Sequence, residues 1–71
     1  MVDMIYIDSS NLDQIGFDEY AGEAHVIFKG GRHYVYSGVT AEVWEAFRSS
    51  ESKGRFLNTE FRAKDYDYRE L

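Results

Sequence analysis

The sequence predicts an α+β fold, in which a three-stranded antiparallel meander is followed by two short helices packed on one face of the sheet. Two observations predict it. Up to residue 37, runs of alternating, β-branched or aromatic residues are separated by glycine-containing turns, as in hairpins. From residue 40 onward, apolar residues recur at helical spacing after capping residues. The chain has only 71 residues and contains no proline, no repeat and no low-complexity tract that would indicate a linker, so we expect a single domain spanning residues 1–71.

The strands are predicted from the N-terminal half. Residues 13–20, "DQIGFDEY", alternate between apolar and polar positions, which predicts a half-buried strand. After a turn at "YAGE", residues 24–29, "AHVIFK", and residues 33–37, "HYVYS", predict two further strands. Residues 4–7, "MIYI", are compatible with a short N-terminal extra strand or with a packed arm.

The loop around Gly30 and Gly31 decides which face two tyrosines occupy, because a slip of one residue exchanges the faces of a strand. If the two glycines alone form the turn, Phe28 pairs with His33, and the tyrosines lie on an open face suited to stacking bases. That face would also carry the side chains His25, Lys29, Arg32, Tyr34 and Tyr36.

If the loop is Lys29-Gly30-Gly31, with Gly31 in the left-handed position of a bulge, Phe28 opposes Arg32 instead. The tyrosines then join the face that the helices cover. The outward side chains become His25, Ile27, His33, Val35 and Ser37. We favour this register, because a chain this short needs its large rings in the core.

Two helices are predicted after Gly38. Thr40 is expected to cap the first, "AEVW…", and Val39 and Trp44 have the spacing of a hydrophobic staple. Its apolar stripe is predicted to be Val43, Ala46 and Phe47. Ser52 is expected to cap the second helix, "KGRFLNTEF", whose buried side is Phe56, Leu57 and Phe61. Residues 63–71 alternate charge and tyrosine, and we expect a loose tail there.

Composition narrows the function. The formal charge is −5, and residues 1–28 contain six acids and no Lys or Arg, which favours a partner with a basic surface over a polyanion. No cysteine is present, which excludes thiolate zinc sites and fits a reducing cytoplasm. With no apolar run of about 20 residues and no basic N-terminal segment, we expect neither membrane insertion nor export.

Enzyme chemistry is not predicted. The sequence lacks the G-x-S-x-G, P-loop, H-E-x-x-H and G-x-G-x-x-G patterns, and its carboxylates are scattered. His25 and His33 share the outer face in the favoured register, but two imidazoles without a fixed carboxylate make a poor metal site. We therefore expect no catalytic residues, no metal and no cofactor.

The order of these features resembles the KTSC domain, a small bacterial and phage module named for its occurrence at the C-terminus of some lysyl-tRNA synthetases. The resemblance covers about residues 7–62. It rests on "SSNLDQIGFD" (9–18), "VIFKGGRHYVYSGV" (26–39) with its central Tyr-x-Tyr, and "SKGRFLNTEF" (52–61). Thr40 departs from the pattern, in which a proline is expected. The resemblance implies a domain of unknown function in the cytoplasm of a bacterial or phage-infected cell, with RNA binding suggested by the synthetase association.

Two partner classes follow from the sequence. We favour a protein partner with a basic surface that belongs to the nucleic-acid machinery. This chain would then act, for example, as a phage-type regulator or inhibitor of host transcription or defence. Asp18 and Glu19 would contact it beside Tyr20, with residues 13–20 offering an edge strand; the same two acids could equally protect that edge from aggregation. The alternative is RNA or single-stranded nucleic acid, contacted by Lys29, Arg32, His33, Tyr34, Tyr36, Lys53 and Arg55.

Overall fold

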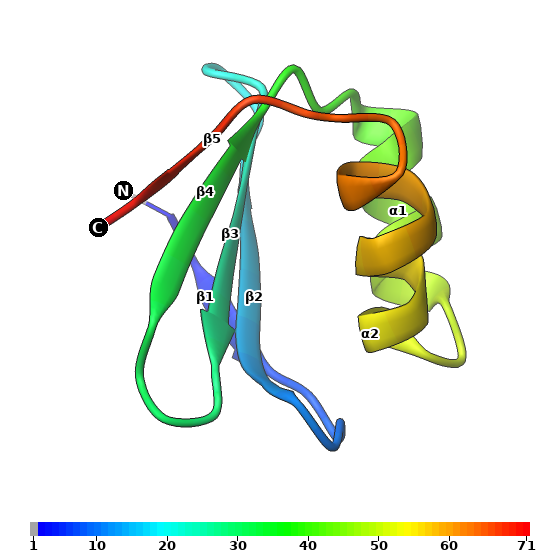
Figure 1. The fold of residues 1–71 in the computed structure, drawn as a ribbon. Coiled ribbons are helices and arrows are strands. Elements are labelled where there is room, and N and C mark those ends of the chain that lie inside the picture. The colour runs from blue at the N-terminus through cyan, green and yellow to red at the C-terminus, as the bar shows by residue number, and fades with distance from the viewer. Residues whose placement is uncertain (1) are drawn as a thin grey trace.

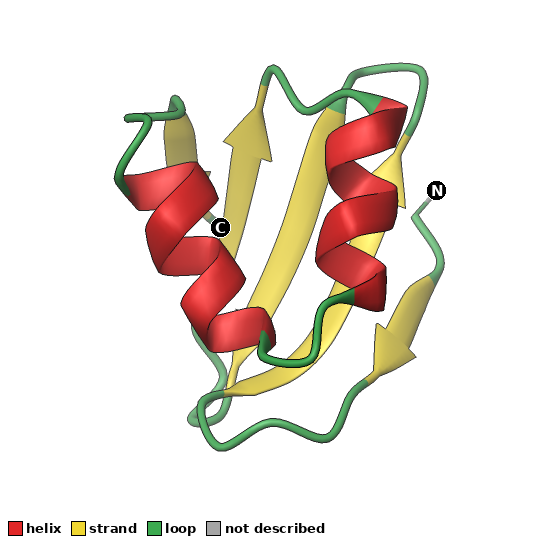
Figure 2. Ribbon diagram, turned by 90° about the vertical axis from the view of Figure 1, so that its right-hand side faces the viewer, coloured by secondary structure: helices red, strands yellow, loops and turns green. Residues whose placement is uncertain are grey.

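The computed structural model describes residues 2–71, which form one antiparallel sheet covered on one face by helices (Figures 1 and 2). Within these residues the sheet has five strands in the order β1-β2-β3-β4-β5. The strands are β1 (Met4–Tyr6), β2 (Leu12–Asp18), β3 (Glu23–Phe28), β4 (His33–Ser37) and β5 (Tyr68–Glu70). The helical layer comprises α1 (Ala41–Ser49), α2 (Lys53–Phe56) and the π-helical segment η1 (Leu57–Arg62), which continues α2. The α+β class and the antiparallel meander with two helices are confirmed.

The two outer strands extend the predicted sheet. The N-terminal extra strand is present as β1, whose Ile5 pairs with Ile15 of β2. The predicted strand over residues 13–20 is therefore not a sheet edge, because β1 and β3 flank it. The prediction of a loose tail over residues 63–71 is wrong at its end, since β5 pairs antiparallel with β4.

The hairpin between β3 and β4 has the favoured register. The backbone N–H of Phe28 donates to the carbonyl oxygen of Arg32 at 2.8 Å, and Val26 and Ala24 oppose Tyr34 and Tyr36. Gly30 and Gly31 have φ angles of 105° and 97°, which side chains with a Cβ rarely adopt. The open stacking face that required Phe28 to pair with His33 is therefore wrong.

The core lies between the sheet and the helices. Its buried members come from β2, β3, β4, α1, η1 and the loop before α1, and are Leu12, Ile15, Ala24, Val26, Tyr36, Val39, Phe47, Leu57 and Phe61. Tyr34 is half-buried against this cluster. Val35 faces the open side of the sheet as predicted, yet it is fully buried, lying between His25 of β3 and Arg69 of β5. Burial on that side thus comes from neighbouring strands.

Both predicted helix caps are present. The Thr40 hydroxyl accepts from the N–H of Val43 at 3.2 Å, and the Ser52 hydroxyl accepts from the N–H of Arg55 at 3.3 Å. The first helix turns Val43, Trp44 and Phe47 toward the core, whereas Ala46, predicted in that stripe, is exposed. Among the residues described, no helix combines the length and apolar character needed to cross a membrane.

Candidate functional site

The turn between β2 and β3 places the predicted acidic residues at one end of the sheet. One carboxylate oxygen of Asp18 accepts from the backbone N–H groups of Tyr20 at 3.1 Å and Ala21 at 3.2 Å. The N–H of Gly22 donates to the Asp18 carbonyl at 2.9 Å, and Gly22 takes a φ of 66°. Asp18 therefore holds the turn through its side chain and also contributes a negative charge there.

An acidic hollow lies beside this turn, and it is lined by the residues of the turn together with residues that the sequence analysis did not assign to the site. It has a volume of about 300 Å³ and is lined by Asp3, Phe17, Asp18, Glu19, Tyr20 and Trp44. The rings of Phe17 and Trp44 stack at a centroid distance of 5.4 Å, and the side chain of Tyr20 is 97% exposed. Carboxylates around aromatic rings suit the guanidinium or ammonium group of a basic side chain.

Asp3 and Trp44 were missed as members of this site. Trp44 was assigned from the sequence to a hydrophobic staple, and its stacking on Phe17 depends on how α1 crosses β2. Asp3 reaches the hollow because the chain leading into β1 runs along β2; its carbonyl oxygen lies 3.0 Å from the position of a Cβ built on Gly16. Only the pairing of β1 with β2 could have indicated that proximity.

The residues proposed for nucleic-acid contact do not form one basic surface. Arg32 donates two hydrogen bonds to the Glu70 carboxylate, both at 2.9 Å, and its guanidinium lies 5.7 Å from the centre of the Tyr34 ring. The Nζ of Lys53 donates to the carbonyl oxygen of Ser50 at 2.9 Å. Lys53 and Arg55 line a hollow together with the acids Asp8 and Glu51. Most of these cations thus have anionic or backbone neighbours.

The basic hairpin tip, at Lys29, shares a hollow with the helical layer. Lys29 of the hairpin lies across a hollow of about 320 Å³ from Gly54 of α2 and Arg62 of η1. Arg62 was not predicted as a site residue. The hairpin tip and the helical layer therefore converge through Lys29 and Arg62 rather than through Lys53 and Arg55.

His25 and His33 lie side by side on the open face, as the register predicts. The Nδ1 of His25 and the Nε2 of His33 are 2.9 Å apart, a hydrogen-bonding distance. Burial, followed by the neighbouring His33, lowers the pKa of His25 below its usual value. Within residues 2–71, no cluster of three or more potential metal ligands accompanies them.

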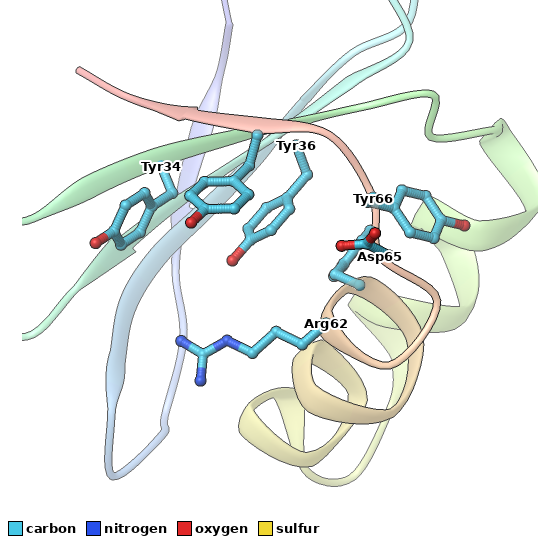
Figure 3. A pocket seen from close by; sticks show the side chains of 7 residues that line it. Tyr34, Tyr36, Arg62, Asp65 and Tyr66 are labelled. Carbon is cyan, nitrogen blue, oxygen red and sulfur yellow. The ribbon is translucent and has the colours of Figure 1, made fainter.

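A tyrosine cleft opens where β4 and β5 face the end of η1 (Figure 3). Its volume is about 260 Å³, and its lining residues are Tyr34, Tyr36, Phe61, Arg62, Asp65, Tyr66 and Tyr68. Tyr34 and Tyr36 are thus brought together, but on the helix side of the sheet. The sequence did not predict the cleft, because Tyr68 joins it only through the pairing of β5 with β4.

The turn from η1 into β5 fixes the back of this cleft. Asp65 takes a φ of 57°, and the N–H of Tyr66 donates to the carbonyl oxygen of Phe61 at 3.0 Å. The Tyr66 hydroxyl donates to a carboxylate oxygen of Glu60 at 2.6 Å. Burial, with the Glu60 carboxylate adding to it, raises the pKa of Tyr66 to about 12. The phenol therefore remains a hydrogen-bond donor at neutral pH.

Fold and site together define a small α+β domain with a five-stranded sheet, one helical layer and surface hollows. The family model of the KTSC domain matches residues 8–66, and the chain therefore belongs to the KTSC domain family. The crystal structure of a KTSC domain protein from Yersinia pestis has the same fold, with a TM-score of 0.91 and 26% sequence identity. That similarity covers 100% of this chain and 99% of the other.

Two relatives match in sequence. An uncharacterized protein of Stutzerimonas stutzeri is 33% identical over 64 residues, which is 90% of each chain. A protein of Tsukamurella paurometabola is 35% identical over 52 residues, covering 73% of this chain and 78% of the other. The KTSC domain family is one of unknown function.

Proposed function

We propose that this domain is a non-enzymatic binding module that engages a protein partner through a basic segment at the acidic hollow. One observation carries the proposal: three acidic residues, Asp3, Asp18 and Glu19, line a hollow that is also lined by the stacked pair Phe17 and Trp44. A Lys or Arg side chain of the partner would lie against the rings while the carboxylates balance its charge.

Exposure and charge support this choice. Tyr20 projects at the rim with 97% of its surface exposed, and interfaces are enriched in tyrosine that becomes buried on binding. Glu19 is also exposed. Because the chain carries a net charge of −5, its field attracts basic segments and repels polyanions. That the partner belongs to the nucleic-acid machinery stays a prediction.

The test is capture of a partner by the full chain and by charge-reversed variants. Asp3→Lys with Glu19→Lys reverses two exposed acids at the hollow. Asp18 is left intact, because its carboxylate holds the turn. The matched control is Asp8→Lys with Glu51→Lys, which changes the net charge equally at two exposed acids elsewhere.

We expect the wild-type chain and the control variant to capture a partner in stoichiometric amount. The Asp3→Lys, Glu19→Lys variant should not capture it. The single substitution Tyr20→Ala should weaken capture of the partner, because it removes a large exposed ring. A partner retained at full strength by the reversed variant would place the interface elsewhere and reject the acidic hollow.

A further inference from the structure

We propose that the tyrosine cleft is a binding site for a small organic anion that carries a flat ring, of the size and chemistry of a nucleoside monophosphate. The site is separate from the acidic hollow, since it is built by β4, β5 and η1 rather than by β2 and α1. It therefore goes beyond the proposed protein-binding function, and either can fail alone.

The hydroxyl of Tyr36 is available to hydrogen-bond a ligand in the cleft. The residue is 4% exposed, and in the described part of the chain its hydroxyl has no hydrogen-bond partner. The same residues contain no polar side-chain atom that is both sealed from solvent and unpartnered, so this hydroxyl must open into the cleft. Figure 3 shows it pointing into the space above Arg62. A buried tyrosine that keeps its polar tip free in a cavity is prepared for an external partner.

Arg62 supplies the positive charge. Its guanidinium extends from η1 below the tyrosines, and one of its nitrogens donates to the side-chain oxygen of Asn58 at 3.2 Å. That hydrogen bond orients the group while leaving other N–H donors of the guanidinium free. A phosphate or carboxylate placed between Arg62 and the Tyr36 hydroxyl would receive charge-assisted hydrogen bonds from both.

The ring of Tyr68 is the surface for the flat part of the ligand. Its centroid lies 5.8 Å from that of Tyr34 in an edge-on arrangement and 5.7 Å from that of Tyr36. These contacts hold the ring in place, yet the side chain remains 65% exposed. A rigid, exposed aromatic ring beside an anion site suits a stacked base or a similar ring.

The acids around the cleft favour a single small anion over a strand. Asp65 lines the cleft itself, Asp67 directly precedes β5, and the Glu70 carboxylate beside Tyr34 is bound to Arg32. A second and third phosphate of a polymer would meet these carboxylates. The volume of about 260 Å³ lies just below the range of about 300–1,000 Å³ for small-molecule pockets, so the cleft has room for no more than one nucleotide-sized ligand, part of which would remain exposed.

The experiment is an NMR titration of the full isotope-labelled chain with four probes: adenosine monophosphate, adenosine, inorganic phosphate and single-stranded oligo(A) RNA. We expect adenosine monophosphate to shift the signals of Tyr36, Arg62 and Tyr68 in a saturable way, and adenosine and phosphate to bind at least about tenfold more weakly. Tyr36→Phe, which removes only the hydroxyl, should weaken binding about tenfold, and Arg62→Gln at least as much. Arg55→Gln, at an exposed arginine outside the cleft, is the control that should leave binding unchanged.

Several results would overturn the proposal. One is the absence of saturable shifts with adenosine monophosphate up to about 10 mM, because a dissociation constant above that concentration would be weaker than that of almost any functional site. Equal binding to the Tyr36→Phe variant, with an unchanged melting temperature, would reject the hydroxyl's role. If the oligo(A) RNA binds more tightly per nucleotide than the monophosphate, the cleft is part of a nucleic-acid-binding surface and not a site for a small ligand. None of these outcomes bears on the acidic hollow, whose signals from Phe17 and Trp44 serve as an internal reference.

Discussion

The backbone N–H of Phe28 donates to the carbonyl oxygen of Arg32 at 2.8 Å, and this hydrogen bond fixes the faces of the whole hairpin. With that register, Tyr34 and Tyr36 lie against the helical layer and His25 and His33 lie on the open face. The tyrosine cleft depends on this register, because a slip of one residue would move Tyr34 and Tyr36 to the open face of the sheet.

Replacing Gly31 with alanine tests this turn. The φ of 97° at Gly31 is unfavourable for a residue with a Cβ, so we expect Gly31→Ala to destabilise the domain by about 1–2 kcal/mol. The control is Gly54→Ala, where a Cβ meets only the Asn11 side chain at 3.7 Å within a helix, and where alanine should be neutral or stabilising. Urea unfolding measures both; equal stability of the two variants would contradict the turn geometry.

Gly16 is predicted to require the absence of a side chain. A Cβ there would lie 2.5 Å from Met4 Sδ, 2.8 Å from Val2 Cγ1 and 3.0 Å from the Asp3 carbonyl oxygen. We expect Gly16→Ala to cost about 1–3 kcal/mol and to loosen β1, measured by unfolding and by amide exchange at residues 4–6. Met4→Ala should recover part of this cost in a double-mutant cycle. Fully additive effects would mean that the two side chains do not meet.

His25 should make stability depend on pH just below neutrality. Because burial lowers its pKa in the folded state, the unfolded chain binds more protons as the pH falls below the ordinary histidine pKa of about 6.5. Stability is therefore full above that value and decreases as the pH falls toward the lowered folded pKa. Unfolding measured at pH 7.5 and pH 5.5 should show a smaller loss for His25→Phe than for the wild type. An identical loss would assign the dependence to other groups.

Tyr66 should resist ionisation until strongly alkaline pH. Its pKa of about 12 lies above the unfolded value of 10, so its contribution to stability is complete below pH 10 and is lost as the pH rises toward 12. Absorbance near 295 nm, compared between wild type and Tyr66→Phe, should reveal a phenol that titrates near pH 12. Loss of the hydrogen bond to Glu60 should also cost the variant about 1 kcal/mol. A difference spectrum that titrates near pH 10 would show that this phenol is neither buried nor paired.

The fold was largely predictable because its signals are local. Loop length and the demand for buried rings indicated that Val26 opposes Tyr34, and Thr40 and Ser52 marked the two helix starts. The strand β5 was missed because its alternation of tyrosine and charge was interpreted as a tail. Arg69 binds Glu23 at 2.8 Å, so the charges have partners that only the three-dimensional pairing provides.

The sites were predictable only in part, for the same reason. Asp18, Glu19 and Tyr20 are consecutive, and their exposure at a turn could be inferred from the sequence. Asp3 and Trp44 join them through the packing of β1 and α1 against β2. Arg62 and Tyr68 lie on opposite sides of a cleft that exists only once β5 has paired. Residues that are distant in sequence and share no motif give no local signal of such proximity.

Trp44 is the chain's single tryptophan, and it reports directly on the acidic hollow. The decisive measurement is its fluorescence during titration with an arginine-rich peptide, with an acidic peptide of equal length as the reference. If basic segments bind at the hollow, the basic peptide alone gives a saturable change. This change weakens with salt, disappears in the Asp3→Lys, Glu19→Lys variant and persists in the Asp8→Lys, Glu51→Lys control. An unchanged signal, or equal responses from the two variants, would contradict binding of basic segments at this hollow.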